Sequence, residues 1–349
     1  MPMPDEVAAI RNSAALSRMD HVRCVWVRGA RAYEALDRIV TSDLRVRDGQ
    51  MIQSLLLDDD GYIVADIHLA CDGDEFIILA EGPDAAGMNA YLQRHLSAAG
   101  VEFEDRSGAQ ALITINGPYA WELLALLAGP GVVGLPYLTL FHFEGGICFR
   151  AGKTGEYGYG ILIPTESHDD LWSRLLELGG AVDVAVAGLD ALDQCALENW
   201  YFNIRREGRE AATPVELQLQ WRLSHRKHYV GSESVTRRRQ DGPRERLTCL
   251  VTDGAVTVGD AVVIEGAPAG RVVNAGHSDV LDHWVALGLI DIRWAHPGID
   301  AFRVRRSDRE VSARSVTPPL LNNRSLHVSP QIHSYATRDE FSFPPLPRL

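Results

Sequence analysis

The sequence lacks the features that mark secreted, disulfide-bonded and membrane-spanning chains. Its five cysteines are odd in number, scattered and without a Cys-x-x-Cys pair, so neither a disulfide framework nor a structural zinc site is indicated. No basic region followed by an apolar run opens the chain, so we expect no signal peptide. The longest apolar region, residues 123–138, is interrupted by the Gly-Pro-Gly of residues 129–131 and is too short to cross a bilayer. These absences predict a protein of the reducing cytoplasm with no membrane partner.

An excess of positive charge is also missing. Lys and Arg number 34 against 47 Asp and Glu, and the net charge of −13 disfavours a nucleic-acid-binding or anionic-membrane surface. His225 and His228 have the spacing of metal ligands, but no further ligand accompanies them, so we expect no metal site. Nucleic-acid and membrane partners are therefore not expected, and the sequence does not indicate an oligomeric state.

Apolar runs separated by Asp- and Gly-rich turns predict antiparallel strands early in the chain. Residues 55–57, 63–69 and 76–79 are such runs, and the Asp and Gly between them tolerate the left-handed conformation that hairpin turns need. Helical patterns flank these strands at residues 5–16 and 85–99. The pattern is typical of a sheet covered by helices.

The same alternation of strand and helix patterns repeats in the next part of the chain, and the pattern then changes to short strands and turns. The chain, with 349 residues of which 46% are hydrophobic, is long enough for two or three domains. We expect an α+β protein with mainly antiparallel sheets and a small C-terminal β-barrel. The expected units are a first α+β domain at residues 1–110, a second at residues 111–240, the barrel at residues 241–317 and an extended tail at residues 318–349.

A glycine-punctuated turn is the most informative single stretch. Residues 150–160 read Arg-Ala-Gly-Lys-Thr-Gly-Glu-Tyr-Gly-Tyr-Gly and lead directly into an apolar strand at residues 161–163. Glycines at this density let the backbone approach a ligand closely. Such a turn occurs in many folds, so it does not identify a fold by itself.

Five segments in chain order, the glycine turn among them, are more specific than the turn alone. They are residues 9–22, Thr41-Ser42-Asp43-Leu44, residues 55–69, residues 150–164, and residues 188–199 together with the Thr213-Pro214-Val215-Glu216 turn. Together they resemble the glycine cleavage T-protein (aminomethyltransferase) superfamily, which includes folate-dependent demethylases. The resemblance covers nearly the whole chain. It implies a three-domain cloverleaf around a central channel for tetrahydrofolate.

The resemblance implies a catalytic role for Asp66. This aspartate falls where the family places its carboxylate near the N5/N10 edge of the folate. A fixed carboxylate there can orient the cofactor amine and stabilise the positive charge that develops as a one-carbon unit moves. The alternative is an ordinary polar residue on a strand. His21, at a family position beside the cavity, is a second candidate, for substrate contact or proton transfer.

The chain departs from the family pattern in the expected cofactor site. Lys153 stands where the glycine-turn motif has a tyrosine, and Gly160 where it has a glutamate that accepts two hydrogen bonds from the pterin edge. Glu81 stands where an asparagine is expected, and it or Glu156 is a candidate substitute carboxylate. The long helix carries Leu192 and Ala196 in place of arginines. The residues assigned to the cofactor are Asp66, Glu81, Lys153, Glu156, Tyr157 and Glu198.

Other polar and aromatic residues allow two interpretations each. Glu198 either contacts the cofactor or caps a backbone or holds an inter-domain hydrogen bond. Trp200 and Tyr201 are candidates to stack on a planar substrate, with core filling as the alternative. The basic run from Arg222 to His228 either holds the glutamate tail of a folate or forms a solvated loop.

The leading interpretation is a tetrahydrofolate-dependent one-carbon transferase. It is expected to act as a demethylase or an aminomethyltransferase-like enzyme on a small methylated or aminomethylated substrate. The alternative is a protein of the same fold that has lost folate dependence and uses the channel for another small molecule. A branch of the family that acts in iron–sulfur assembly is disfavoured, because its signature cysteine is missing from residues 227–233.

Overall fold

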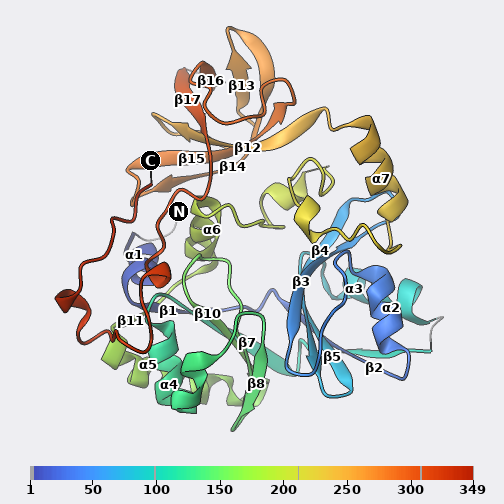
Figure 1. The fold of residues 1–349 in the computed structure, drawn as a ribbon, viewed down its shortest axis with the longest axis vertical. Helices are drawn as coiled ribbons and strands as arrows, with labels where there is room; N and C mark the ends of the chain where they lie inside the picture. The colour runs from blue at the N-terminus through green and yellow to red at the C-terminus, as the bar shows by residue number, and fades with distance from the viewer. Residues whose placement is uncertain (1–3, 98–99, 211, 307–308, 349) are drawn as a thin grey trace.

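Two sheets and one closed barrel form the framework of the chain (Figure 1). The computed structural model describes residues 4–97, 100–210, 212–306 and 309–348. The barrel lies at the top of Figure 1, the two sheets lie side by side below it, and α6 (Leu189–Glu198) runs between the three units. The prediction of an α+β fold with mainly antiparallel sheets and a C-terminal barrel is confirmed.

The first sheet is entirely antiparallel and has the order β3-β4-β5-β2-β6. Its strands are β2 (Arg23–Arg28), β3 (Met51–Leu57), β4 (Ile63–Asp72), β5 (Glu75–Glu81) and β6 (Glu102–Asp105). Two helices cover one face, α2 (Ala32–Ile39) and α3 (Ala85–Leu96). The predicted continuation of the second helix to residues 98–99 lies outside the described residues.

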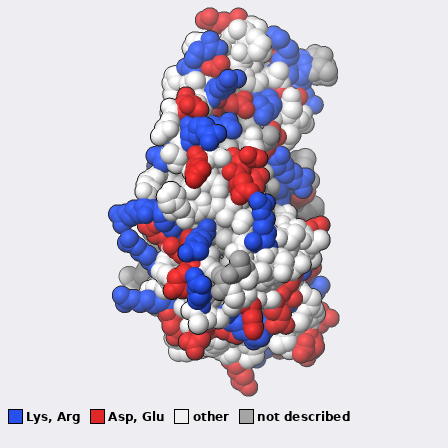
Figure 2. Space-filling model, turned by 90° about the vertical axis from the view of Figure 1, so that its right-hand side faces the viewer, with Lys and Arg blue, Asp and Glu red and all other residues white. Residues whose placement is uncertain are grey.

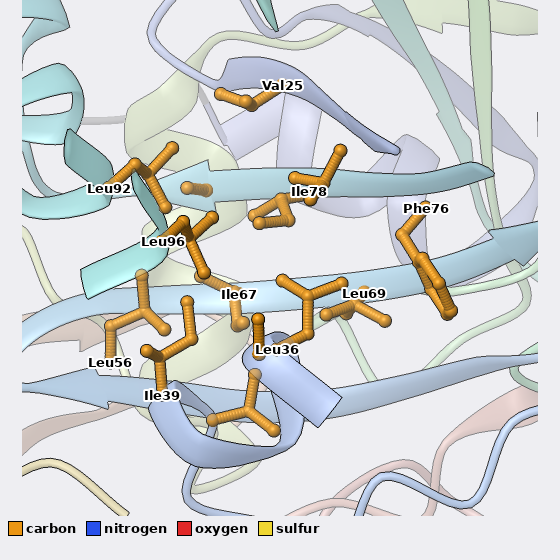
Figure 3. Packing of buried hydrophobic residues seen from close by; sticks show 14 of the residues in the cluster. Val25, Leu36, Ile39, Leu56, Ile67, Leu69, Phe76, Ile78, Leu92 and Leu96 are labelled. Carbon is orange, nitrogen blue, oxygen red and sulfur yellow. The ribbon is translucent and has the colours of Figure 1, made fainter. Parts of the chain in front are cut away.

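Alternation along β4 decides which side chains face the helices. Ile67 and Leu69 pack beneath Leu36 of α2 and Leu96 of α3, and all four are fully buried (Figure 3). Because successive side chains of a strand point to opposite faces, Asp66 lies on the other face of the sheet. That face is turned toward the second sheet.

The second sheet has six strands in the order β11-β1-β7-β10-β9-β8. They are β1 (Ala14–Arg18), β7 (Gln110–Asn116), β8 (Leu140–Phe143), β9 (Gly146–Phe149), β10 (Gly158–Pro164) and β11 (Val184–Val186). One face packs under α4 (Ala120–Ala128) and α5 (His168–Gly179). The other face packs on the first sheet, where Leu112 and Phe149 join Trp26 and Leu79 in one buried cluster.

The predicted helix over residues 5–16 is too long. Helix α1 (Pro4–Asn12) ends before Ser13, and β1 follows at once. Strand β1 pairs with β7 in antiparallel and with β11 in parallel orientation, so it lies in the second sheet although it precedes every strand of the first. Its Ala-Ala-Leu-Ser-Arg sequence has no strong strand preference, and pairing on both edges overrides the local propensity.

The barrel closes in the order β12-β15-β14-β13-β16-β17. Its strands are β12 (Glu245–Thr252), β13 (Ala261–Ile264), β14 (Ala267–Ser278), β15 (His283–Asp291), β16 (Phe302–Arg305) and β17 (Glu310–Val316). Sequence patterns missed β17, which pairs with both β12 and β16 and so closes the barrel. Helix α6 packs against β14 and β15, and α7 (Ser232–Asp241) connects the barrel to the preceding domain.

The last segment returns from the barrel to the second sheet (Figure 1). Within residues 318–348 the structure has only two short 3₁₀ turns, η7 (Arg324–Leu326) and η8 (Arg338–Glu340), besides loops and an isolated bridge. Val328 is buried in the core of the second sheet, and Tyr335 and Phe343 pack against that core. The tail is therefore anchored along the domain surface rather than separate from it.

The molecular surface carries charges of both signs. Figure 2 shows basic and acidic side chains interspersed over one face of the molecule. None of the helices in the described ranges is long and apolar enough to cross a membrane.

Candidate functional site

A cavity lies between the facing surfaces of the two sheets, below α6. Much of its wall is apolar and comes from both sheets and from α6. Its polar lining includes Asp66, Glu81 and Lys153. Its apolar lining includes Met19, Val22, Met51, Leu79, Leu112, Phe149, Leu192 and Ala196. Apolar walls with a few convergent charged groups are typical of small-molecule sites.

Asp66 is held by two cations. Its Oδ1 accepts a hydrogen bond from Arg222 at 2.7 Å, and its Oδ2 accepts one from Lys153 at 2.7 Å. The carboxylate is 1% exposed. Burial opposes ionisation, but the charges of Arg222 and Lys153 more than offset it and lower the pKa of Asp66. Asp66 is therefore a fixed anion at neutral pH and not a proton donor.

Lys153 joins Asp66 to a second carboxylate. Its Nζ donates to Glu81 Oε1 at 2.6 Å, and Glu81 lies directly opposite Asp66 on the neighbouring strand. Burial favours the neutral lysine, but the two carboxylates outweigh it and raise the pKa of Lys153. The same ammonium, with His21 and Arg205, holds the pKa of Glu81 well below its usual range despite burial. Lys153 thus links the glycine turn of one sheet to two strands of the other.

His21 lies at the edge of this network. Its Nε2 is 3.2 Å from Glu81 Oε2 and 2.6 Å from Arg205. Arg205 also pairs with Asp193 of α6, which accepts a further hydrogen bond from Asn203 at 2.6 Å. The structure therefore brings His21 next to Glu81, which Lys153 links to Asp66.

Arg222 is the residue that sequence reasoning misjudged. From sequence, the basic run from Arg222 onward is interpreted either as a binding site for the glutamate tail of a folate or as a solvated loop. In the structure the Arg222 side chain is only 1% exposed. Its guanidinium lies 4.8 Å from the ring of Trp221 and reaches Asp66 from the loop before α7. The flanking Leu219 and Leu223, both buried, are the sequence signal that this segment enters the core.

His68 is a second residue that the sequence did not single out. It lies two positions after Asp66 on β4 and lines the same cavity. Burial and the nearby charge of Lys153 lower the pKa of His68 to about 4. The imidazole is therefore neutral at physiological pH.

Three of the assigned cofactor residues lie elsewhere. In the described part of the chain, Glu156, Tyr157 and Glu198 fall outside the set of residues that line the cavity. Glu156 accepts hydrogen bonds from the backbone N–H groups of Arg324 and Ser325, and Tyr157 donates to the carbonyl of Val328 at 2.8 Å. These contacts bind the glycine turn to the C-terminal tail.

Glu198 connects α6 to α1 and the barrel. It accepts a hydrogen bond from Arg11 at 2.7 Å and one from Ser278 of β14 at 2.7 Å. Arg11 also donates to the carbonyl of Thr154 in the glycine turn at 2.6 Å. This geometry matches the inter-domain role that the sequence left open, and the cofactor role of Glu198 stays a prediction.

The two aromatic candidates are also outside the described cavity lining. Trp200 is partly buried against the cluster that contains Phe202 and Leu217, which is the packing expected of a core residue. Tyr201 is partly buried, and burial raises the pKa of its hydroxyl. Their contact with a substrate stays a prediction.

The chain matches two family models over most of its length. The GCVT N-terminal domain matches residues 2–227, and the glycine cleavage T-protein C-terminal barrel domain matches residues 245–322. The aminomethyltransferase of Chlorobaculum parvum is 32% identical over 71% of this chain and 70% of its own length. That of Rubrobacter xylanophilus is 30% identical over 91% of this chain and 86% of its own length.

A solved structure has the same fold. The glycine cleavage system aminomethyltransferase T from Bartonella henselae superposes with a TM-score of 0.84, at 22% identity, over 91% of this chain and 89% of that protein. The relatives favour a folate-dependent one-carbon transferase over the alternative of an enzyme or binding protein of the same fold that has lost folate dependence. With both of its domains matched in order, the chain belongs to the glycine cleavage T-protein (aminomethyltransferase) family.

Proposed function

We propose that the chain transfers a one-carbon unit from a small methylated or aminomethylated donor to tetrahydrofolate in the cavity between the two sheets. The observation that carries the proposal is the ionised, buried Asp66 that faces the cavity between Lys153 and Arg222. A fixed anion in a largely apolar cavity stabilises positive charge more strongly than it would in water.

The cavity has the chemistry to hold a folate ring. Leu112 and Phe149 offer an apolar wall, and the buried polar atoms His68 Nε2 and Thr114 Oγ1 have no hydrogen-bond partner within the described residues. Gly160 has no side chain and therefore supplies no polar group of its own. A Cβ at this position would lie 3.3 Å from Leu112 Cδ1 and 4.0 Å from Phe149. The donors and acceptors available to a bound ring therefore come from its neighbours.

When bound, tetrahydrofolate supplies the amine nitrogen that accepts the one-carbon unit. Asp66 acts through its charge and as a hydrogen-bond acceptor, because its lowered pKa leaves no proton to donate. Arg222 fixes the Oδ1 side of the carboxylate and is itself buried. Lys153, 18% exposed and shared with Glu81, is the partner that can shift toward Glu81 and leave Asp66 Oδ2 to the reacting amine.

A demethylase-type donor fits this cavity better than an aminomethyl group on a protein carrier. Leu192 and Ala196 line the cavity on the α6 side, where arginines are expected from the family pattern. An apolar wall there favours a small donor with a methyl group and gives no charged handle for a carrier. We therefore propose methylated amines, ethers and thioethers as the first donors to test.

The experiment combines binding and turnover. Anaerobic calorimetry of the purified protein with tetrahydrofolate should show binding, and single-turnover assays with candidate donors should show one-carbon transfer. Asp66→Asn keeps the size of the side chain, removes the charge, and should reduce turnover at least a hundredfold, in line with the loss of a single preorganised electrostatic group. Asp60→Asn, in the exposed turn between β3 and β4, is the matched control.

Two results would contradict the proposal. Absence of tetrahydrofolate binding by the wild-type protein would remove the cofactor from the mechanism. Equal turnover in the wild type and in a folded Asp66→Asn variant would remove Asp66 from it.

A further inference from the structure

The cavity contains two buried polar atoms that have no hydrogen-bond partner within the described residues, His68 Nε2 and Thr114 Oγ1. Buried polar groups in folded proteins are almost always paired, and exceptions at a cavity wall indicate a ligand or an ordered water. Both side chains can donate or accept, because a neutral imidazole and a hydroxyl each have both capacities.

The two residues line the cavity from different sheets. His68 lies on β4 directly opposite Leu79, and Thr114 lies on β7 directly opposite Gly160. Gly160 is the position where the glycine-turn motif carries its glutamate. Thr114 is therefore the cross-strand neighbour of the position that lacks the carboxylate, and His68 lines the same cavity from the other sheet.

The carboxylates near His68 are already paired with cations. Asp66 and Glu81 share Lys153 and are each held by an arginine, Arg222 or Arg205. Of the groups that face His68, Lys153 and Arg222 lower its pKa, and Asp66 and Glu81 raise it. Burial decides the outcome, and the imidazole stays uncharged. A ligand group between His68 and Thr114 is consequently met by neutral hydrogen-bonding partners and apolar walls.

We propose that His68 and Thr114 form the pair that recognises the uncharged amide-type edge of the pterin ring, in place of the glutamate missing at position 160. A cyclic amide presents an N–H donor and a C=O acceptor side by side, which suits two groups that can each donate or accept. The inference rests on the proposed function, since it assigns residues that bind the cofactor named there.

The test separates ring recognition from the rest of the cofactor. The probe is tetrahydropterin, which has the ring but lacks the benzoylglutamate tail, titrated anaerobically against the full chain beside tetrahydrofolate. Thr114→Val and His68→Phe keep the approximate shape and remove the hydrogen-bonding atoms. Each should weaken binding of both probes about tenfold, the usual effect of leaving one buried hydrogen bond unmade.

Ser17→Ala is the matched control. Ser17 lies directly opposite Thr114 on β1, and its hydroxyl is also buried and without a partner in the described structure, but Ser17 is outside the cavity lining. Its removal should leave both affinities unchanged. Thr114→Ser retains the hydroxyl and should keep wild-type affinity, which guards against a Thr114→Val variant that fails to fold.

The outcomes distinguish this inference from the proposed function. Wild-type binding and turnover, combined with unchanged affinity in folded His68→Phe and Thr114→Val, would overturn the assignment and leave the transferase intact. No binding of either probe to the wild type would overturn both. Weaker binding in the two variants but not in Ser17→Ala supports the assignment.

Discussion

Lys153, in the glycine turn between β9 and β10, donates a 2.7 Å hydrogen bond to Asp66 of the first sheet, across 87 positions of sequence. The bond joins two residues of the cavity wall, one of them the carboxylate that the resemblance to the family assigns to catalysis. It also places a cation where the family motif has a neutral tyrosine. The charge of the site is therefore set by a contact between sheets, and its removal should be visible in the pH dependence of the reaction.

Replacing Lys153 by methionine keeps most of the volume and removes the charge. Because Lys153 lowers the pKa of Asp66, the acid limb of the pH–rate profile should move to higher pH in Lys153→Met. The free energy of unfolding should fall by about 2 kcal/mol, less than for a fully buried pair because Lys153 is 18% exposed. Urea denaturation and a pH–rate profile measure the two effects.

Lys227 provides the control for this variant. It pairs with Asp37 at 2.8 Å, is 13% exposed, and lies outside the described cavity lining. Lys227→Met removes a partly buried lysine and its ion pair outside the cavity and should leave the pH–rate profile unmoved. A profile that is the same in Lys153→Met as in the wild type would mean that Lys153 does not set the charge of the site.

Arg222 should matter for stability and for turnover. Arg222→Met leaves Asp66 buried with only the partly exposed Lys153 as a partner, so the free energy of unfolding should fall by about 3 kcal/mol, the scale of a broken buried ion pair. Turnover should fall with it, because Asp66 Oδ1 loses its anchor. Chemical denaturation and the single-turnover assay check this. Arg226→Met, at an exposed position of the same run, should change neither quantity, and equal effects in both variants would contradict the buried role.

These residues show what the sequence can and cannot predict. The position of Asp66 on a strand beside the cavity could be predicted, because the strand pattern and the family resemblance both rest on neighbouring residues in the sequence. Leu219 and Leu223 signal that the segment around Arg222 is buried, but the ion pair of Arg222 with Asp66 could not be predicted, because that partner is 156 positions away. The same reason explains β1, whose strand conformation is imposed by β7 and β11 rather than by its own residues.

His68 should make stability depend on pH in a defined window. Its pKa is about 4 in the folded chain, against about 6.5 for an unfolded histidine. Between these values the unfolded state binds the proton first, so stability is fully present above about pH 6.5 and falls as the pH drops toward 4. Burial of the residue is incomplete, and we expect a loss of about 2 kcal/mol in this window.

Denaturation curves at several pH values test this against His68→Phe, which should lack that part of the slope. Burial raises the pKa of Glu207 to about 7, but Glu207 is present in both proteins and its contribution cancels in the comparison. Asp66 and Glu81 have lowered pKa values, so their contribution is present above about pH 4 and is lost only as the pH falls further. A slope between pH 4 and 6.5 that is identical in both proteins would show that the imidazole is not held neutral.

The C-terminal tail should stabilise the site from a distance. Its hydrogen bonds to the glycine turn include those from Arg324 and Ser325, just beyond the matched barrel domain, which ends at residue 322. Ending the chain after residue 322 would expose the pocket of Val328 and remove the backbone donors to Glu156. Burial of one valine alone contributes about 1.5–3 kcal/mol, so we expect a lower melting temperature and a larger Michaelis constant for tetrahydrofolate.

The double change Ser325→Ala with Val328→Ala is the milder test of the same idea. It keeps the full chain, and it should weaken the anchoring of the glycine turn while α1 still reaches that turn through the 2.6 Å bond from Arg11 to the carbonyl of Thr154. Because Lys153 is the residue before Thr154, a loosened turn should weaken the contact of Lys153 with Asp66 and shift the pH–rate profile in the direction of Lys153→Met, by a smaller amount. A destabilised variant with an unshifted profile would limit the tail to a purely structural role.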